Sequence, residues 1–232
     1  MKDDYYEVLN KGYVELIDIM GSDLSIVNAA KVSFSAELDE MNPSAVGLIK
    51  FLMKNKHATP FEHVLFKFRV KCPIFVAREW FRHRWSSFNE MSMRYYVPEK
   101  IDFFYPEEST IRQQVGKPGS YTFEPMEYPE AAYSEVMTQL SHVYKVAENA
   151  YFSMLKEGIA KELARSVLPV GQYTEFIWTV NARSLINFLS LRNDSNAQYE
   201  INEYARIIEE KIFADCLPVT YSAFLESGRE AI

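Results

Sequence analysis

The segment VLFKFRVKC, residues 64–72, constrains the fold more than any other part of this chain. Its apolar residues recur at every second position and alternate mainly with lysine and arginine. Because successive side chains of a strand point to opposite faces of a sheet, this pattern predicts a strand with one buried face. Two further segments, GYVELIDIM (12–20) and EFIWTV (175–180), also predict strands. Such a sheet needs other elements to cover its buried face.

Helix signals lie between and after these strands. Ser22 or Asp23 is suited to cap one helix, and Asn181 is suited to cap another. Pro43 and Pro73 are suited to the first turn of two more. We expect helices over residues 22–30, 44–56, 74–84, 130–157, 159–167, 182–192 and 197–215.

Two stretches predict loops. Residues 57–63 lose their periodicity at Pro60, and residues 98–129, with five prolines, predict a long loop of the kind that forms lids. Strands and helices follow one another in no regular βαβ order. We therefore predict an α+β fold in a single domain over residues 1–232, with an antiparallel sheet packed by helices and a long helical segment.

Composition narrows the class of function. The chain has 25 basic and 32 acidic residues, a net charge of −7, which disfavours a broad nucleic-acid interface. The opening MKDDYYEVLN lacks the apolar region of a signal peptide, and no apolar run approaches the ~18 residues of a membrane span. Cys72 and Cys216 have no metal-ligand spacing, and no HExxH motif is present. We expect a cytoplasmic protein with no metal site and no nucleic-acid or membrane partner.

Basic residues gather in one segment of this acidic chain. Arg78, Arg82, His83, Arg84 and Arg94 lie within 17 residues, against two glutamates. A small basic pocket predicts a small anionic ligand rather than a polymer. On the predicted helix, Arg78 and Arg82 are a like-charged i,i+4 pair, which either an intervening glutamate or an external phosphate compensates.

The segment after this helix adds further polar groups. If residues 89–94 are extended, alternation puts Glu90, Ser92 and Arg94 on one side. A carboxylate, a hydroxyl and a guanidinium together are suited to a phosphate with its sugar or base. A solvated edge strand is the alternative interpretation.

These residues form a motif that resembles a known family. Arg82-His83-Arg84, seven residues and then Ser92 reproduce the RHR-x7-S signature of the flavin-dependent thymidylate synthases. TPFEH (59–63), PIFVAR (73–78) and WTVNARSLINFLSLR (178–192) agree with the same family, as does the run 164–169. The resemblance covers nearly the whole chain except residues 97–129.

The resemblance implies a homotetramer that binds FAD at subunit interfaces and methylates dUMP to dTMP. The family takes the carbon from 5,10-methylenetetrahydrofolate and reducing equivalents from NADPH. By motif position, the dUMP site draws on Glu79, Arg82, Glu90, Met91, Ser92, Met93, Arg94, Arg165 and Arg192. The FAD site draws on Thr59, Arg82, His83, Arg84, Glu90, Asn181, Arg183 and Asn187.

Arg192 is the candidate catalytic residue, because the matching arginine is thought to help ionise N3 of uracil and so activate C5. Arg165 and Arg192 also sit where a cation stabilises the C-terminal end of a helix, and this plainer role explains either one alone. Asn181 is equally explained as a cap, and Arg183 and Asn187 as a polar stripe on a helix.

Three positions depart from the family pattern. Glu79 replaces the usual glutamine, and we expect its carboxylate to pair with Arg78 or Arg82. Contact with the base is the alternative, and it would favour dCMP, whose amine donates to a carboxylate. Asn196 replaces a frequent histidine and Ala58 a frequent acid. Two rival functions remain open at this point: an enzyme for another pyrimidine nucleotide, and a non-catalytic nucleotide- or nucleic-acid-binding module.

Overall fold

A five-stranded antiparallel sheet is the centre of the computed structural model, which describes residues 5–118 and 120–232. Its strand order is β1-β2-β3-β7-β4. The strands are β1 (Tyr5–Val8), β2 (Gly12–Met20), β3 (Leu65–Pro73), β7 (Tyr173–Asn181) and β4 (Ser86–Glu90). The predicted strands over 12–20, 64–72 and 175–180 are confirmed as β2, β3 and β7, and the α+β class with them.

The two central strands carry the alternation that the sequence predicts. β3 and β7 pair from Leu65 with Asn181 to Pro73 with Tyr173. Phe66, Phe68 and every second side chain after them in β3 are fully buried, whereas Lys67, on the opposite face, is exposed. One face of the sheet therefore builds the core and the other carries charged side chains.

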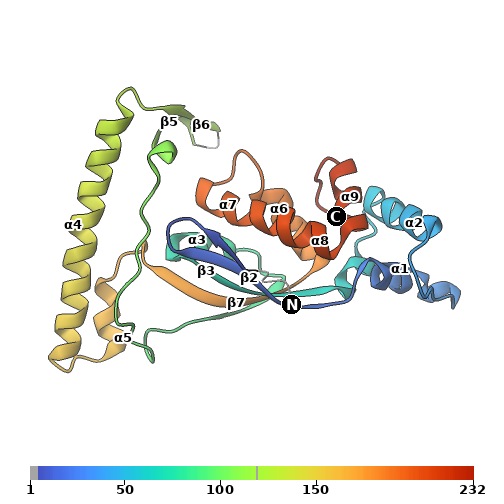
Figure 1. The fold of residues 1–232 in the computed structure, drawn as a ribbon, viewed down its shortest axis with the longest axis horizontal. Coiled ribbons are helices and arrows are strands. Elements are labelled where there is room, and N and C mark those ends of the chain that lie inside the picture. Colours follow the sequence, from blue (N-terminus) through green and yellow to red (C-terminus); the bar gives the residue numbers. More distant parts are fainter. Residues whose placement is uncertain (1–4, 119) are drawn as a thin grey trace.

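Helices α3 (Ile74–Trp80), α6 (Ala182–Arg192) and α7 (Tyr199–Ile207) cover the apolar face of the sheet (Figure 1). Trp80 of α3 is fully buried. Its ring centroid lies 5.2 Å from Trp178 of β7, 4.8 Å from Phe188 of α6 and 5.6 Å from Tyr204 of α7. This aromatic cluster joins all three helices to the sheet.

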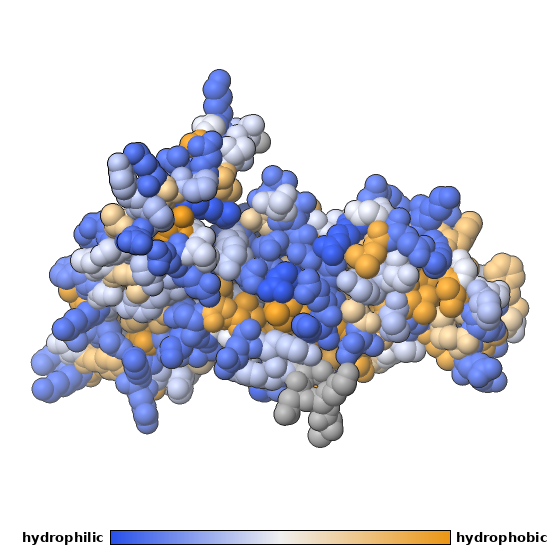
Figure 2. Space-filling view, turned by 45° about the horizontal axis from the view of Figure 1, so that its top comes forward, coloured by the Kyte–Doolittle hydropathy of each residue, from blue (hydrophilic) through white to orange (hydrophobic). Residues whose placement is uncertain are grey.

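Helices α1 (Asp23–Lys31), α2 (Pro43–Lys54) and α9 (Pro218–Glu226) pack together at one end of the sheet (Figure 1). Asp23, only 5% exposed, accepts hydrogen bonds from the backbone N–H groups of Val219 and Thr220 at 2.9 Å each. It thus caps α9 from the first turn of α1. Apolar residues are exposed at this end (Figure 2): Val32, Phe34 and Phe51 are 74%, 78% and 54% exposed.

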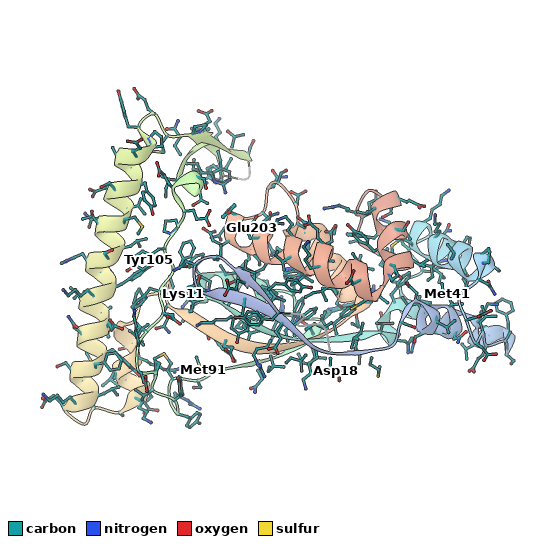
Figure 3. The ribbon with its side chains drawn as sticks, viewed as in Figure 1. Lys11, Asp18, Met41, Met91, Tyr105 and Glu203 are labelled. Atoms are coloured by element: carbon teal, nitrogen blue, oxygen red, sulfur yellow. The ribbon has the colours of Figure 1, made fainter. Side chains whose placement is uncertain are left out.

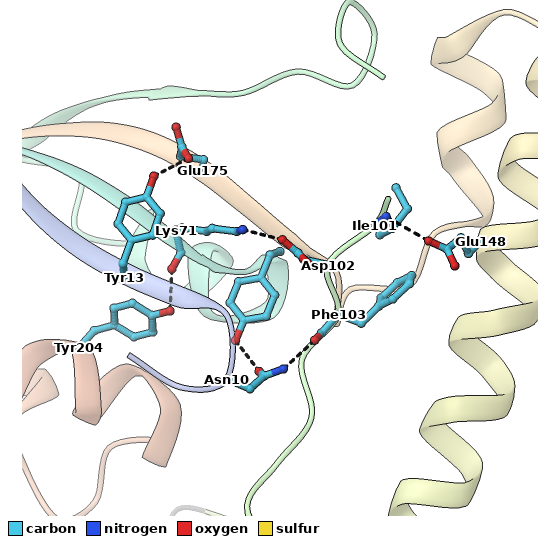
Figure 4. A network of polar contacts seen from close by, with 10 residues as sticks. Asn10, Tyr13, Lys71, Ile101, Asp102, Phe103, Glu148, Glu175 and Tyr204 are labelled. Atoms are coloured by element: carbon cyan, nitrogen blue, oxygen red, sulfur yellow. Dashed lines mark hydrogen bonds and ion pairs between the residues drawn. The ribbon is translucent and has the colours of Figure 1, made fainter. Parts of the chain in front are cut away.

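The long helix α4 (Pro129–Lys156) stands at the opposite end, followed by the short α5 (Lys161–Ala164). Gly158, with φ of +80°, makes the turn between them. Polar contacts tie this end to the sheet (Figure 4): Asn10 donates to the Phe103 carbonyl at 3.0 Å, and the Ile101 N–H donates to Glu148 of α4 at 3.0 Å. Within the described residues, no helix is both long and apolar enough to cross a membrane.

Several predicted boundaries are wrong. The helix predicted over 74–84 ends at Trp80, and the predicted loop 57–63 is a 3₁₀ helix, Thr59–His63. The predicted loop 98–129 contains a hairpin of β5 (Arg112–Lys117) and β6 (Ser120–Pro125). Residues 159–167 form α5 and a 3₁₀ turn (Arg165–Val167).

The last predicted helix is also interrupted. A π-helical stretch, Ile208–Phe213, lies between α7 and α8 (Ala214–Cys216), and α9 follows without having been predicted. Tertiary packing decides the helix boundaries, because residues such as Trp80 and Ile208 bury against neighbouring elements rather than following one helical stripe. The hairpin β5–β6 is instead largely exposed and is held by the pairing of its own two strands.

Candidate functional site

A first cleft of about 540 Å³ opens between residues 82–86 and α6. Five residues of the predicted FAD set line it: Arg82, His83, Arg84, Arg183 and Asn187. Arg192, the candidate catalytic residue, lines the same cleft. The signature segment and the α6 segment, about a hundred positions apart, therefore meet at one site.

Local structure explains how α6 presents these groups. Asn181 accepts a hydrogen bond from the Ser184 N–H at 2.8 Å and so begins the helix, as predicted. Arg183 and Asn187 follow on one face at i,i+4 spacing. Arg192 ends the helix at the far side of the cleft.

Arg192 is held by two neighbours from the signature region. Its Nη1 donates to Oε1 of Glu79, and its Nε donates to Nε2 of His83 at 2.9 Å. The side chains of Arg192 and Glu79 are 21% and 24% exposed, so this pair is only partly solvated. The prediction that Glu79 pairs with Arg78 or Arg82 is wrong, because α3 ends at Trp80 and its last turn faces the end of α6.

His83 has a strongly lowered pKa. Burial disfavours its charged form, and the positive charge of Arg192 adds to this, so that the pKa falls to about 4. Its Nε2 accepts from Arg192 and carries no proton, which is consistent with a neutral ring. At neutral pH, His83 therefore acts here as a hydrogen-bond acceptor rather than as a cation.

The other arginines of the first cleft differ in their partners. Arg183 pairs with Glu62 at 2.5 Å and lies over the ring of Trp85, 5.1 Å from its centroid. Arg82 and Arg84 form no ion pair with any residue that the structure describes. Two unpaired guanidinium groups beside an exposed indole and an amide fit a phosphate-bearing cofactor with an aromatic ring, such as the predicted FAD.

A second cleft, of about 800 Å³, lies between the end of β4, α3 and the 162–174 segment. Six residues of the predicted dUMP set line it: Glu90, Met91, Ser92, Met93, Arg94 and Arg165. Met91 lies on the side of the sheet that faces α4 and α5 (Figure 3). The condition of an extended segment over 89–94 holds only as far as Glu90, where β4 ends. The Tyr95 N–H then turns back to the Ser92 carbonyl at 3.1 Å.

Arg78 also lines the second cleft and was not assigned to either predicted site. Its membership of the basic cluster over residues 78–94 is the sequence signal that could have assigned it to an anion site. Neither Arg78 nor Arg165 has an acidic partner among the described residues, so both remain available to an anion. Glu90, in contrast, accepts a hydrogen bond from Thr174 at 2.7 Å.

The predicted sets are divided between the clefts. Of the dUMP set, Arg82 and Arg192 line the first cleft and Glu79 binds Arg192 there, whereas the other six residues line the second. Of the FAD set, Glu90 lies in the second cleft, and Thr59 and Asn181 line neither. One copy of the chain therefore does not gather either set in one place.

The remaining positions singled out in the sequence have local roles. Asn196 donates from its backbone N–H and its amide to Asp194, at 2.8 and 2.9 Å. Ala58 is buried, 8% exposed, in front of the 3₁₀ helix. Among the residues described, no three His, Cys, Asp or Glu side chains group as metal ligands do.

Comparison with known proteins identifies the family. Residues 15–219 match the family model "Thymidylate synthase complementing protein". The chain is 46% identical over 219 residues to the "Flavin-dependent thymidylate synthase" of Thermotoga neapolitana, covering 94% of this chain and 93% of that one. It is 46% identical over 223 residues to the enzyme of the same name from Thermosipho melanesiensis, covering 95% and 93%.

A solved structure has the same fold. The crystal structure of the UMP/dUMP methylase PolB from Streptomyces cacaoi bound with 5-Br UMP superimposes with a TM-score of 0.86 at 37% identity, covering 97% of this chain and 99% of that one. The arrangement of sheet and helices is thus similar to that of a nucleotide methylase. Together with the relatives above, this places the chain in the family of the flavin-dependent thymidylate synthases.

Proposed function

We propose that this protein is a flavin-dependent thymidylate synthase that methylates dUMP to dTMP, with FAD as cofactor, 5,10-methylenetetrahydrofolate as carbon donor and NADPH as reductant. One observation carries the proposal in this chain: the first cleft brings the signature residues Arg82, His83 and Arg84 against Arg183 and Asn187 of α6. Family membership and the fold of a UMP/dUMP methylase support the same conclusion.

The residues of the first cleft would bind the flavin nucleotide. Arg82 and Arg84, both without ion pairs among the described residues, are suited to its phosphates. The exposed indole of Trp85 and the amide of Asn187 are suited to its rings and polar edges. When bound, the flavin supplies the redox chemistry, so the protein needs no nucleophile of its own.

Arg192 would act on the pyrimidine. Two of its donors are engaged by Glu79 and His83, and this fixes the plane of the guanidinium. Its remaining N–H groups are available to the O2/N3 edge of a uracil base, where they would stabilise the negative charge that makes C5 nucleophilic. In the second cleft, Arg94 and Arg165 would bind the substrate phosphate, together with the hydroxyl of Ser92.

A second copy of the chain would complete the dUMP site. The division of the predicted dUMP residues between two clefts supports this, because one nucleotide needs both groups. A homotetramer meets the requirement if the first cleft of one copy faces the second cleft of another.

Mixed oligomers test the shared site. Arg192→Ala and Arg94→Ala each damage a different cleft, so a mixed oligomer contains some sites built only from intact residues. With random 1:1 mixing, about a quarter of the sites are intact, one half times one half. Coexpression of the two variants should therefore restore measurable turnover. Oligomers shown by mass to be mixed, yet inactive, would mean that each copy holds a complete site.

The activity itself is tested with dUMP tritiated at C5. Purified yellow protein should release tritium and form dTMP only when methylenetetrahydrofolate and NADPH are both present. Protein that stays colourless after incubation with FAD, or that releases no tritium with every component added, would contradict the assignment. UMP belongs in the same assay, because the structural relative is a UMP/dUMP methylase.

The dCMP alternative has less support. Oε1 of Glu79 already accepts from Arg192, which leaves only one carboxylate oxygen for a base amine. Binding of dCMP no tighter than that of dUMP would exclude it. We also propose a cytoplasmic location, and the fully buried free thiol of Cys72 supports a reducing compartment.

A further inference from the structure

A buried carboxylate lies behind the end of α6 and outside both clefts. Glu209, in the π-helical stretch Ile208–Phe213, is 0% exposed. Its Oε2 accepts a hydrogen bond from the side-chain amide of Asn193 at 2.7 Å. Asn193 is the C-cap of α6 and directly follows Arg192. Burying a carboxylate fully costs free energy, so a buried carboxylate that contacts the end of α6 suggests a specific role there.

A second side chain, from α7 just before the π-helical stretch, also holds the end of α6. The amide of Asn202, on α7, donates to the carbonyl of Arg192 at 3.0 Å and to that of Asp194 at 3.2 Å. The last carbonyls of a helix have no partner within the helix, and a side-chain donor here fixes the direction in which the chain leaves. Both contacts bear on the backbone that carries Arg192.

The π-helical stretch gives Glu209 its place. A π-helical turn inserts an extra residue into a helix and shifts the side chains that follow. Such turns are rare and frequently occur at functional sites. In this chain the turn begins one residue before Glu209 and lies directly after α7, which carries Asn202.

The negative charge of Glu209 is compensated from the C-terminal segment. Nη2 of Arg229 lies 2.8 Å from Oε1 of Glu209. Arg229 adopts a left-handed conformation, with φ of 63°, directly after Gly228 with φ of 75°. Arg229 follows α9, so the segment after this helix supplies the counter-charge of the buried carboxylate.

We propose that Glu209, Asn193 and Asn202 form a positioning unit that fixes Arg192 against Glu79 and His83 and so sets its guanidinium for the reaction. The proposal deepens the proposed function and rests on it, because Arg192 belongs to that site. The three residues do not line either cleft. Asn202 acts through the carbonyl of Arg192, and Glu209 acts through Asn193, the next residue in the chain. The side chain of Arg192 meanwhile keeps its two hydrogen bonds to Glu79 and His83.

His83 provides a readout that needs no turnover. Burial and then the charge of Arg192 lower its pKa to about 4. If Asn202→Ala or Asn193→Ala releases Arg192, the pKa of His83 should rise towards its ordinary value near 6.5, because a nearby positive charge is removed. NMR titration of the full chain labelled at histidine measures this, with His83→Gln to identify the signal.

Two further variants complete the experiment. Glu209→Gln keeps an acceptor for Asn193 and should leave the pKa of His83 as in the wild type. Asn55→Ala is the matched control, because Asn55 caps α2 and its amide donates to the Phe51 carbonyl at 2.8 Å, far from the site. It loses the same kind of bond and should leave the pKa of His83 unchanged.

Kinetics give a second readout. Asn202→Ala and Asn193→Ala should lower kcat for dUMP by roughly tenfold to a hundredfold, as a small misplacement of a catalytic group does, while KM stays within about twofold. Variants that fold and keep both the pKa of His83 and kcat at wild-type values would overturn the positioning unit. If the wild-type protein has no activity but the pKa of His83 still rises in Asn202→Ala and Asn193→Ala, only the proposed function is overturned.

Discussion

Arg192 and His83 share a hydrogen bond of 2.9 Å in which the guanidinium Nε donates to the imidazole Nε2. The two residues lie 109 positions apart, one at the end of α6 and the other in the RHR signature. The bond requires an unprotonated nitrogen on His83, so the histidine of this signature is neutral. The three basic residues of the RHR signature therefore carry two positive charges rather than three. The first cleft is therefore less positive than its sequence suggests.

Replacement of Arg192 by alanine should abolish most turnover. Removing a preorganised donor at the site of developing charge lowers kcat by about 10²- to 10³-fold. The absorbance of bound flavin should persist, because Arg82 and Arg84 remain. Tritium release and flavin absorbance measure the two effects. Arg206→Ala, which removes an arginine paired with Glu203 and Glu210 on the protein surface, is the control, and normal turnover of Arg192→Ala would refute the activating role.

Glu79→Gln should tighten dUMP binding. The amide keeps an acceptor for Arg192 but removes a negative charge near an anionic substrate. Partly exposed charges interact by up to about 1 kcal/mol, so we expect roughly twofold to fivefold tighter binding by calorimetry. Glu203→Gln, which alters a glutamate outside both clefts, should change nothing. Weaker binding in Glu79→Gln would instead show that the carboxylate contacts the substrate directly.

Acid should destabilise the protein through His83. The folded state lowers the pKa of this residue from 6.5 to about 4, so the unfolded chain binds the extra proton more readily. This contribution to stability is present in full above about pH 6.5 and is lost as the pH falls towards 4. Urea unfolding at pH 7.0, 5.5 and 4.5 measures how the free energy of unfolding falls with pH, and this fall should be smaller in His83→Gln. An equal fall in both proteins would show that His83 titrates normally.

The cap that Asp23 provides for α9 should matter for stability. Asp23→Ala leaves two backbone N–H groups and the hydroxyl of Thr220 without their acceptor. The loss of a buried cap of this kind costs about 2 kcal/mol, and a lowered urea midpoint with an unchanged slope would report it. Asp18→Ala is the control, since Asp18 is exposed and its carboxylate accepts a local hydrogen bond from the N–H of the next residue, Ile19. If both variants unfold alike, the cap contributes nothing specific.

The sequence predicts the parts of this fold that rest on local patterns. Alternation reveals β2, β3 and β7, and Asn181 reveals the start of α6. Strand β1 is not predicted because it has only four residues and lies at the edge of the sheet. The hairpin β5–β6 is not predicted because its prolines and polar residues are typical of loops. Long-range packing supplies what these patterns lack.

The site shows the same limit. The RHR-x7-S motif predicts which residues belong to a nucleotide site, and the first cleft gathers five of the eight predicted FAD residues. The pairing of Glu79 with Arg192 could not be predicted, because it joins residues 113 positions apart and depends on where α3 ends. The buried carboxylate of Glu209 gives no signal in the sequence, where it is one glutamate of an ordinary amphipathic helix.

In the part of the chain that the structure describes, strands β5 and β6 pair with each other and with no strand of the five-stranded sheet. Nearly all of its described side chains are exposed. Chain length can therefore change between Thr110 and Glu127 without disturbing the register of the five-stranded sheet or the lining of either cleft. This makes the hairpin the natural place to introduce a fluorophore or an affinity tag, and the part of the chain where insertions and deletions would be tolerated most readily during evolution.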